Sequence, residues 1–281
     1  MPELPEVEVI SSALNVTLAH QKLLSMTIRR PTLRYPINPD DPKVLVGQYL
    51  LKITRKAKYM LWHFEKNIYI LHLGMSGSIH WVNDHTEWAK HEHIEWQFEK
   101  NTLRLLDPRR FGFWVEDSLK WENKFSTFGP EPLLNWDVLS WYNKLKNSPR
   151  SIYTLLMDQK IISGLGNIYV QEALFKSNIN PKSQMKTLKL NKIELLSNNI
   201  IKVLRQAIQF GGTTLSDHTQ VDGSKGRFQS QLMIYGRGKK YCLICNTIIE
   251  SYVKAQRTVS FCSQCQQDTQ MVIQQSSDTD R

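Results

Sequence analysis

The chain has 281 residues, and its 36 Lys plus Arg against 26 Asp plus Glu give a formal net charge of +10. With 41% hydrophobic and 22% charged residues, the composition excludes a disordered, collagen-like or coiled-coil chain and suits one large domain or two ordinary ones. No apolar run is long enough to span a membrane, and the first residues lack the pattern of a signal peptide. We therefore expect a soluble cytoplasmic protein whose excess positive charge indicates a polyanionic partner, most commonly nucleic acid.

The first predicted element is a helix from residue 4 to about 18. Pro5 suits the first turn of a helix, and Val7, Ile10 and Leu14 recur on one face. This pattern predicts an amphipathic helix with one buried side.

Residues 22–115 show the pattern of short strands. Ile94, Trp96 and Phe98 alternate with polar residues, which indicates a strand with one buried face. Segments 68–73 and 103–106 are further predicted strands. Several short strands separated by turn residues favour a β-sandwich or barrel.

Beyond Phe128-Gly129-Pro130 the pattern becomes helical. Apolar residues recur at helical spacing over 193–204, and Gly211-Gly212 is typical of a helix end. From residue 266 the sequence is rich in Gln, Ser, Thr and Asp, and we expect a disordered tail over 267–281. The fold class predicted is α+β, with a β domain followed by a helical domain.

All four cysteines lie in two Cys-x-x-Cys pairs separated by 16 residues, namely Cys242, Cys245, Cys262 and Cys265. Two disulfides would need an oxidising compartment, and a redox Cys-x-x-Cys normally occurs singly beside a strand–helix unit. Two such pairs joined by a predicted β-hairpin favour one structural zinc ion with four thiolate ligands. Four protein ligands leave the metal no open position, so we do not expect it to be catalytic.

The second and third residues carry a possible chemistry. Removal of Met1 would leave Pro2 with a secondary α-amine, which is far less basic than a lysine amine and thus partly neutral and nucleophilic near pH 7. Such an amine can attack a sugar C1′ to form an iminium, and Glu3 could supply the proton that opens the sugar ring. By themselves these residues favour an ordinary terminus.

Further motifs along the chain resolve this ambiguity. They are Pro2-Glu3-Leu4-Pro5-Glu6-Val7-Glu8, Arg55-Lys56-Ala57-Lys58-Tyr59, His72-Leu73-Gly74-Met75-Ser76-Gly77, Asp107-Pro108-Arg109-Arg110-Phe111-Gly112, Leu156-Met157-Asp158-Gln159, Gly164-Leu165-Gly166-Asn167-Ile168-Tyr169, Gly211-Gly212-Thr213-Thr214 and Ala255-Gln256-Arg257. With them the chain resembles the formamidopyrimidine-DNA glycosylases over nearly its whole length. These are DNA-repair enzymes that excise 8-oxoguanine and ring-opened purines.

The resemblance implies an architecture. The family has an N-terminal β-sandwich with flanking helices, then a helix–two-turn–helix domain with a zinc-finger hairpin, and DNA lies between the two parts. Carried to this chain, it implies a catalytic domain over 1–130, a helical DNA-binding domain over 131–235 and a zinc finger over 236–266. It also implies a monomer acting on double-stranded DNA at the nucleoid.

The resemblance further implies residue roles in catalysis. Pro2 would be the nucleophile and Glu3 the general acid. Lys58 would donate a proton during β-elimination, and Arg257 would assist δ-elimination, since both steps expel phosphate and nearby cations stabilise the developing charge. Without the motif, Lys58 would be interpreted as a solvated strand lysine.

Other motif positions would hold the DNA. Asn167, at a glycine-rich helix start, would bind a phosphate together with Lys58, His72 and Arg257, and His91 would be another DNA contact. The paired histidines around position 91 have too few neighbouring ligands to indicate a metal.

Excision requires the damaged base to leave the stack, and the void must be filled. Met75, Arg109 and Phe111 match the family's void-filling residues, where an apolar wedge, a guanidinium and an aromatic plane suit this task. Read in isolation, Met75 and Phe111 would be core residues. Residues 215–228 match a loop that closes over the extruded base.

The chain departs from the family at one position. Ile152-Tyr153 stands where the family commonly has Ile-Lys, which puts that contact in doubt and could shift lesion preference. Arg150 is a candidate to compensate. Loss of one phosphate contact should flatten the salt dependence of binding by about one unit of slope.

Three other functions compete with removal of oxidised purines. An endonuclease VIII-like enzyme for oxidised pyrimidines usually has Gly in place of Leu4. A non-catalytic zinc-finger protein that binds damaged DNA would not need Pro2, Glu3, Lys58 and Arg257. A basic scaffold for another polyanion such as RNA has no specific motif. We therefore expect a bifunctional glycosylase and AP lyase of base excision repair.

Overall fold

The computed structural model describes residues 2–83, 86–134, 136–213, 221 and 226–267. The chain forms two compact units. The N-terminal unit comprises Met1–Ser126 and Ala207–Gln229, and the C-terminal unit comprises Thr127–Gln206 and Ser230–Arg281. The chain thus returns to the first unit after most of the second has been completed.

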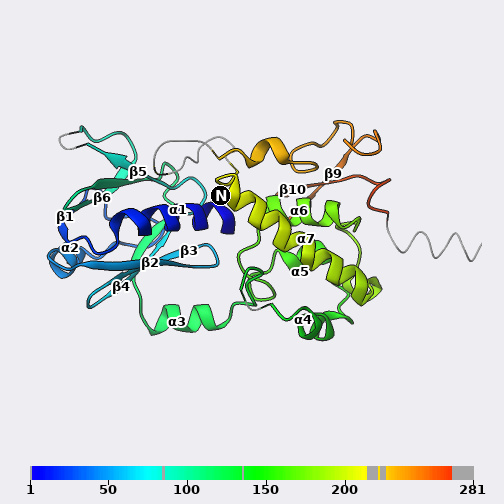
Figure 1. Ribbon diagram of the computed structural model, residues 1–281, viewed down its shortest axis with the longest axis horizontal. Coiled ribbons are helices and arrows are strands. Elements are labelled where there is room, and N and C mark those ends of the chain that lie inside the picture. The colour runs from blue at the N-terminus through cyan, green and yellow to red at the C-terminus, as the bar shows by residue number, and fades with distance from the viewer. Residues whose placement is uncertain (1, 84–85, 135, 214–220, 222–225, 268–281) are drawn as a thin grey trace, which may run out of the picture. The chain divides into compact units, whose positions relative to one another are not determined.

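Two antiparallel four-stranded sheets build the N-terminal unit (Figure 1). One has the order β1 (Leu23–Ile28), β6 (Glu92–Phe98), β7 (Thr102–Leu106) and β5 (Ser78–Val82), and the other has β2 (Leu50–Lys56), β3 (Tyr59–Phe64), β4 (Ile68–His72) and β8 (Phe113–Glu116). Helices α1 (Leu4–Leu18), α2 (Asp41–Leu45) and α3 (Leu119–Ser126) accompany them. The predicted sandwich with flanking helices is confirmed.

The core of this unit lies between the sheets. Trp62, Trp96 and Trp114 are fully buried, with ring centroids 5.0–5.4 Å apart. The predicted alternation in β6 is confirmed, because Ile94 and Phe98 join Trp96 in this core. Helix α1 packs against β2 and buries its predicted apolar face in the same core. The start of α1 is therefore fixed to the sandwich.

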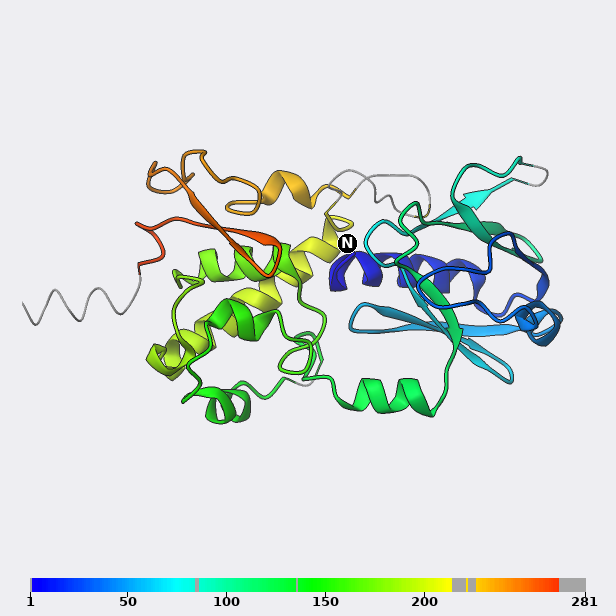
Figure 2. The same cartoon turned by 180° about the vertical axis from the view of Figure 1, so that it is seen from behind.

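The C-terminal unit is mainly helical. It contains α4 (Val138–Leu145), α5 (Ile152–Leu156), α6 (Asn167–Lys176), the 3₁₀ turn Met185–Thr187 and most of α7 (Leu190–Gln209), and a second 3₁₀ turn, Phe228–Gln231, spans the boundary between units. Strands β9 (Glu250–Lys254) and β10 (Arg257–Phe261) form an antiparallel hairpin, and β10 lies alongside α6 (Figure 2). The chain is thus a two-domain α+β protein, as its sequence pattern predicts.

The residue just before the predicted tail is part of the folded structure. Gln266 is buried, its side chain donates to the carbonyl of Ile179 at 2.8 Å, and its own carbonyl accepts from Asn180 at 2.9 Å. Residues 268–281 lie outside the described part of the chain. No helix among the described residues is long and apolar enough to cross a membrane.

Candidate functional site

The N-terminal end of α1 presents Pro2 and Glu3, and both are buried. The carboxylate of Glu6 accepts the backbone N–H of Glu3 at 2.8 Å and that of Thr213 at 2.8 Å. Gly212 has φ +83°, and a Cβ there would lie 3.1 Å from the Glu6 side chain. A glycine is therefore needed for this close approach, and Glu6 fixes the backbone beside the predicted nucleophile.

Lys58 lies in the tight turn that joins β2 to β3 and is only 7% exposed. The guanidinium of Arg55 braces this turn, because it donates to the carbonyl of Ala57 at 2.9 Å and pairs with Glu8 on α1. Lys58 is thus a buried turn residue, unlike the solvated strand lysine that its sequence neighbourhood alone suggests. The Arg55–Glu8 pair connects its turn directly to α1.

His72, at the end of β4, is held as a neutral imidazole. Desolvation, reinforced by the positive charges of Lys58, Arg34 and Lys124, lowers the pKa of His72 to about 3. Its Nδ1 accepts the backbone N–H of Gly74 at 3.0 Å, so the proton of the neutral ring is on Nε2. His72 can therefore donate one N–H bond to a phosphate without carrying a charge of its own.

The three predicted void-filling residues project from two adjacent loops of the N-terminal unit. Met75 is 44% exposed and Phe111 is 42% exposed, so neither is a core residue. The Arg109 guanidinium lies over the Phe111 ring, 4.8 Å from its centroid. His91 immediately precedes β6 and has φ +72°. The structure thus places wedge, aromatic ring and cation together on exposed loops.

Asn167 is the first residue of α6, and the loop before it is shaped by one side chain. Gln159 accepts the N–H of Gly164 at 2.8 Å and donates to the carbonyl of Leu165 at 3.0 Å. Gly164 has φ +90°, and Gly166 is the N-cap in an extended conformation. Gln159 therefore holds the glycine-rich loop that presents the helix N-terminus.

The Tyr153 hydroxyl donates to Oδ1 of Asn167 at 2.9 Å, and Gln171 donates to the same oxygen at 2.7 Å. The Asn167 amide donates in turn to the carbonyl of Thr258 on β10, at 3.2 Å. Tyr153 is 2% exposed, and its hydroxyl orients the Asn167 carboxamide. Arg150, the candidate to compensate, forms an ion pair with Asp158 at 3.0 Å.

Arg257 is exposed at the start of β10, beside the two-residue turn Ala255-Gln256. Both turn residues have positive φ, +47° and +60°, as in a type I′ hairpin turn. Asn167 and Gln171 contact the neighbouring Thr258, so the hairpin that carries Arg257 is docked on α6. The predicted phosphate ligand is thus bonded to the residue next to the predicted elimination residue.

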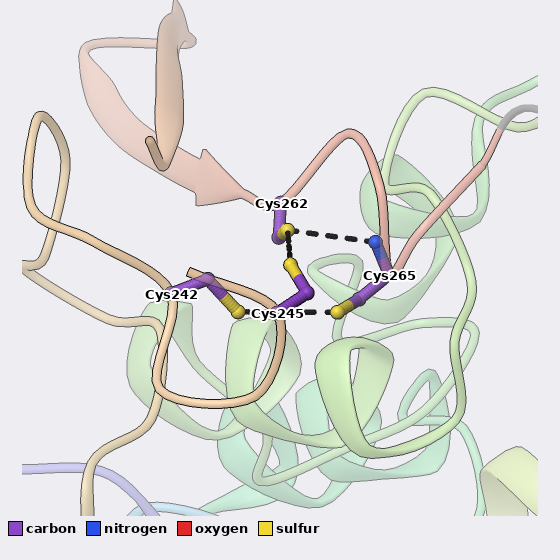
Figure 3. A group of neighbouring side chains, drawn as sticks. All are labelled: Cys242, Cys245, Cys262 and Cys265. Carbon is purple, nitrogen blue, oxygen red and sulfur yellow. Dashed lines mark hydrogen bonds between the residues drawn. The ribbon is translucent and has the colours of Figure 1, made fainter. Parts of the chain in front are cut away.

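The four cysteine Sγ atoms lie within 4.8 Å of one another, and none forms a disulfide (Figure 3). Cys242 and Cys265 are 3.9 Å apart, and Cys245 and Cys262 are 3.4 Å apart. Four thiolates about 2.3 Å from a tetrahedral zinc ion would lie roughly 3.8 Å from one another, so this arrangement fits such an ion. Among the residues that the structure describes, no other group of His, Cys, Asp or Glu is arranged for a metal.

Family models and relatives agree with this geometry. Residues 1–114 match the model of the formamidopyrimidine-DNA glycosylase N-terminal domain, and residues 128–219 match that of the H2TH domain of the same enzymes. The chain belongs to the formamidopyrimidine-DNA glycosylase family. It is 42% identical to the formamidopyrimidine-DNA glycosylase of Acinetobacter baumannii over 95% of its own length and 97% of the relative's. The enzyme of Colwellia psychrerythraea is 41% identical over 95% and 100%.

Solved structures of this family show the same fold. A Lactococcus lactis FPG mutant in complex with DNA containing Fapy-dG matches with a TM-score of 0.88 and 30% identity, covering 95% of this chain and 100% of that chain. The L. lactis protein bound to DNA with an abasic site matches at the same TM-score, identity and coverage. A complex with DNA containing an oxidised pyrimidine matches with a TM-score of 0.86, 31% identity and the same coverage. The chain is therefore a member of a DNA-repair glycosylase family.

The predicted site residues fall into both units. Those in the N-terminal unit are Pro2, Glu3, Lys58, His72, Met75, His91, Arg109 and Phe111, while Asn167, Arg257 and the four cysteines are in the C-terminal unit. Most of the predicted lid over 215–228, namely residues 215–220 and 222–225, lies outside the described part of the chain.

Sequence reasoning missed several residues that hold these groups in place. Glu6 could have been found, because Glu3-x-x-Glu6 at a helix start has the spacing of a capping box. Asp107 and Gln171 show no comparable local pattern, because each bonds to a segment that is distant in the sequence. Gln159 bonds within its own loop, to Gly164 and Leu165.

Proposed function

We propose that this chain is a bifunctional DNA glycosylase and AP lyase that removes 8-oxoguanine and formamidopyrimidines from double-stranded DNA. The observation that carries the proposal is the buried Pro2-Glu3 pair at the start of α1, whose backbone is fixed by Glu6. The names of the relatives support the glycosylase activity. The L. lactis complexes support damaged DNA as the substrate. As in the sequence-based expectation, we propose a monomer that acts at the nucleoid.

The first step joins the enzyme to the sugar. After removal of Met1, the secondary amine of Pro2 attacks C1′, and the bond between C1′ and the damaged base breaks with its electron pair leaving on the base. The base takes up the proton that the amine loses. Glu3 protonates O4′ as the sugar ring opens, and the result is an iminium between Pro2 and C1′.

The iminium then permits strand cleavage. It acidifies the C2′ proton, whose removal expels the 3′ phosphate in β-elimination, and a second elimination expels the 5′ phosphate. We assign Lys58 as proton donor in the first elimination and Arg257 as the cation that supports the second. Cations beside departing phosphates stabilise the developing negative charge. Water then hydrolyses the imine and restores the Pro2 amine.

DNA binding would use both units. His72 offers a neutral Nε2–H, and Asn167 offers an amide N–H at the start of α6, where helix dipole and free backbone N–H groups favour an anion. We assign both, with Lys58, Arg257 and His91, to backbone contacts. Met75, Arg109 and Phe111 would fill the space vacated by the extruded nucleotide.

We further propose that the bound metal is zinc. Cys242, Cys245, Cys262 and Cys265 would hold one ion, and four thiolates complete its coordination. The ion would therefore serve to fold the hairpin that carries Arg257. The clustered, disulfide-free sulfurs support a metal, and their all-thiolate character favours zinc.

The mechanism is tested by trapping the iminium. Purified protein is incubated with borohydride and a duplex containing 8-oxoguanine opposite cytosine, and we expect a covalent protein–DNA adduct in wild type and none in Pro2→Gly. A control variant, Pro39→Gly, alters a proline in an exposed turn and should still be trapped. No adduct in wild type, or an adduct that survives Pro2→Gly, would contradict the mechanism and favour a non-catalytic binding protein.

Substrate choice is tested separately. Single-turnover excision is compared on duplexes with 8-oxoguanine and with thymine glycol, and we expect the purine lesion to be removed faster. Thymine glycol is an oxidised pyrimidine, and the L. lactis protein has been solved in complex with DNA containing an oxidised pyrimidine. The comparison is therefore a stringent test of the preference for purine lesions. Faster removal of thymine glycol would instead assign the chain an endonuclease VIII-like specificity.

A further inference from the structure

Asp107 is a fully buried carboxylate at the root of the loop that carries Arg109 and Phe111. Its Oδ1 accepts the hydroxyl of Ser76 at 2.7 Å, and its Oδ2 accepts the backbone N–H of Gly112 at 2.7 Å. Ser76 belongs to the other loop, the one that carries Met75. A single side chain therefore bonds to both void-filling loops, 107–112 and 73–77.

The two loops are also packed backbone to backbone. A Cβ on Gly74 would lie 2.4 Å from the backbone of Phe111 and Gly112, which no real side chain could occupy. The N–H of Arg109 approaches the Ser76 hydroxyl oxygen at 3.3 Å. With the hydroxyl donating to Asp107 and receiving from Arg109, Ser76 joins the two loops at a second point. Neither loop can shift alone without breaking these contacts.

The backbone of Asp107 extends the same connection to a third segment. Its N–H donates to the carbonyl of His91 at 3.0 Å, and its carbonyl is 2.8 Å from Nε2 of His93. His93 is 2% exposed, and burial lowers its pKa, so the neutral ring donates this bond. The residue before β6, which we assign to DNA binding, is thereby tied to the void-filling loops.

The side chains that this cluster carries differ from its interior in their exposure to solvent. Met75, Arg109 and Phe111 are exposed, while Asp107 and Ser76 are buried beneath them. Exposed apolar side chains on a rigid base suit insertion into a second molecule, because little conformational freedom remains to be lost on binding. Hydrogen bonds to a buried charged group are also stronger than neutral ones.

We propose that Asp107 is the positioning residue of the void-filling apparatus: through Ser76, Gly112 and His91 it holds Met75, Arg109 and Phe111 in the arrangement that enters the duplex. These three side chains would enter the space that the extruded nucleotide leaves opposite an intact partner base. Asp107 itself does not touch the DNA. This proposal rests on the proposed function for its substrate, but insertion into a vacancy is a binding event that can be measured without catalysis.

The test uses a duplex with a stable abasic-site analogue opposite 2-aminopurine, whose fluorescence reports unstacking of the partner base. Ser76→Ala removes one hydroxyl from the cluster, and Asp107→Asn replaces the carboxylate with an amide of the same shape. Wild type should raise the fluorescence on binding, and both variants should give a clearly smaller rise at saturating protein. Met75→Ala should also reduce the fluorescence rise, and the double variant Met75→Ala/Ser76→Ala should reduce it little further.

The same variants separate positioning from a merely structural role. Excision from the 8-oxoguanine duplex should fall about tenfold in Ser76→Ala, the ratio expected for a lost bond to a charged group. A single-stranded abasic oligonucleotide has no partner base to unstack, so its cleavage does not need the void-filling side chains. The cleavage rate on this substrate should therefore change less than about twofold in Ser76→Ala. Ser197→Ala is the control, because Ser197 is equally buried but bonds only within α7.

Three outcomes would overturn the proposal. Wild-type fluorescence in both Asp107→Asn and Ser76→Ala would show that the cluster does not hold the wedge. Equal losses of activity on duplex and single-stranded DNA, accompanied by a lowered Tm, would show that the cluster has a structural role alone. Strictly additive effects of Met75→Ala and Ser76→Ala would show independent action. If wild type forms no iminium, the proposed function fails, while the fluorescence assay still decides the positioning.

Discussion

The carboxylate of Glu6 accepts the backbone N–H of Thr213 at 2.8 Å, although the two residues are 207 positions apart. Its other oxygen accepts the N–H of Glu3, so one buried side chain joins the start of α1 to the Gly-Gly-Thr segment after α7. The segment that appears in the sequence as a simple helix end therefore helps to fix the residues beside Pro2. Both ends of this connection lie in the N-terminal unit, to which the chain returns in the last turn of α7.

The first prediction concerns Glu6→Gln. The amide NH₂ would oppose one of the two backbone N–H groups, and an unsatisfied buried donor costs about 1–3 kcal/mol. We expect a loss of that size in the free energy of unfolding, measured by urea denaturation. We also expect slower iminium trapping under conditions where the variant is fully folded, because the backbone beside Pro2 loses an anchor.

The control for this variant is Glu194→Gln on the exposed side of α7, which should change neither quantity. A Glu6→Gln protein that is destabilised yet trapped at the wild-type rate would limit Glu6 to a role in folding. One that keeps wild-type stability would show that the two N–H groups find other partners.

A second prediction follows from the pKa of His72, which burial and neighbouring cations lower to about 3. An unfolded histidine titrates near 6.5. Between these values the unfolded chain binds a proton that the folded chain does not, so this residue makes the protein less stable as pH falls from about 6.5 towards 3. His72→Gln lacks that proton uptake. The stability difference between wild type and His72→Gln should therefore become less favourable to wild type from pH 7 to pH 4.5.

The measurement is urea denaturation of both proteins at several pH values. The other titrating groups are common to both and cancel in the difference. A pH-independent difference would mean that the ring is protonated in the folded protein as readily as in the unfolded one. In that case His72 could approach a phosphate as a cation.

Metal removal gives a third prediction. Cys262 is fully buried and Cys242 nearly so, in a small cluster with Phe175, Ile234 and Ile249. This cluster is too small to fold the hairpin by itself, and a structural zinc ion commonly supplies that stability. Denaturation in the presence of a strong chelator should release about one zinc ion per chain, as the four-thiolate site requires. We expect Cys262→Ser to lower the Tm and to weaken binding to DNA.

The comparison for this experiment is iminium formation on an abasic oligonucleotide. The proposed nucleophile, Pro2, belongs to the other unit, so we expect residual trapping by the metal-free protein at high DNA concentration. Release of iron or of no metal would contradict the zinc assignment. Unchanged binding in Cys262→Ser would separate the hairpin from DNA recognition.

The sequence predicts well those features that depend on local pattern. The apolar face of α1 through Val7 and Ile10 and the alternation through Trp96 follow from periodicity alone, and the cysteine cluster follows from spacing. Family resemblance supplies the roles of residues such as Met75, whose exposure contradicts what its apolar character suggests in isolation.

What the sequence does not reveal are contacts between distant segments. Asp107 carries no pattern that points to Ser76 or His91, because the pairing of β6 with β7 and the packing of two loops bring them together. The burial of Lys58 was likewise hidden, since it depends on a turn held by Arg55 and Glu8. Such residues bond to backbone or side chains whose location is set only when the sandwich forms.

The last prediction concerns Tyr153, the position where the sequence analysis expects a departure from the family. Tyr153→Phe removes only the hydroxyl that donates to Asn167, while Gln171 still donates to the same oxygen. One neutral hydrogen bond is worth about 0.5–1.5 kcal/mol, so we expect DNA affinity to fall about two- to tenfold. The slope of log K against log salt should stay the same, because no charge is lost.

Tyr153→Lys should instead steepen that slope by about one unit, if its ammonium reaches a phosphate. Tyr142→Phe on α4, which leaves Asn167 untouched, is the matched control. Fluorescence anisotropy over a salt series decides among these outcomes. An unchanged affinity in Tyr153→Phe would show that Gln171 alone orients Asn167, and a changed slope would show that Tyr153 influences a charged contact.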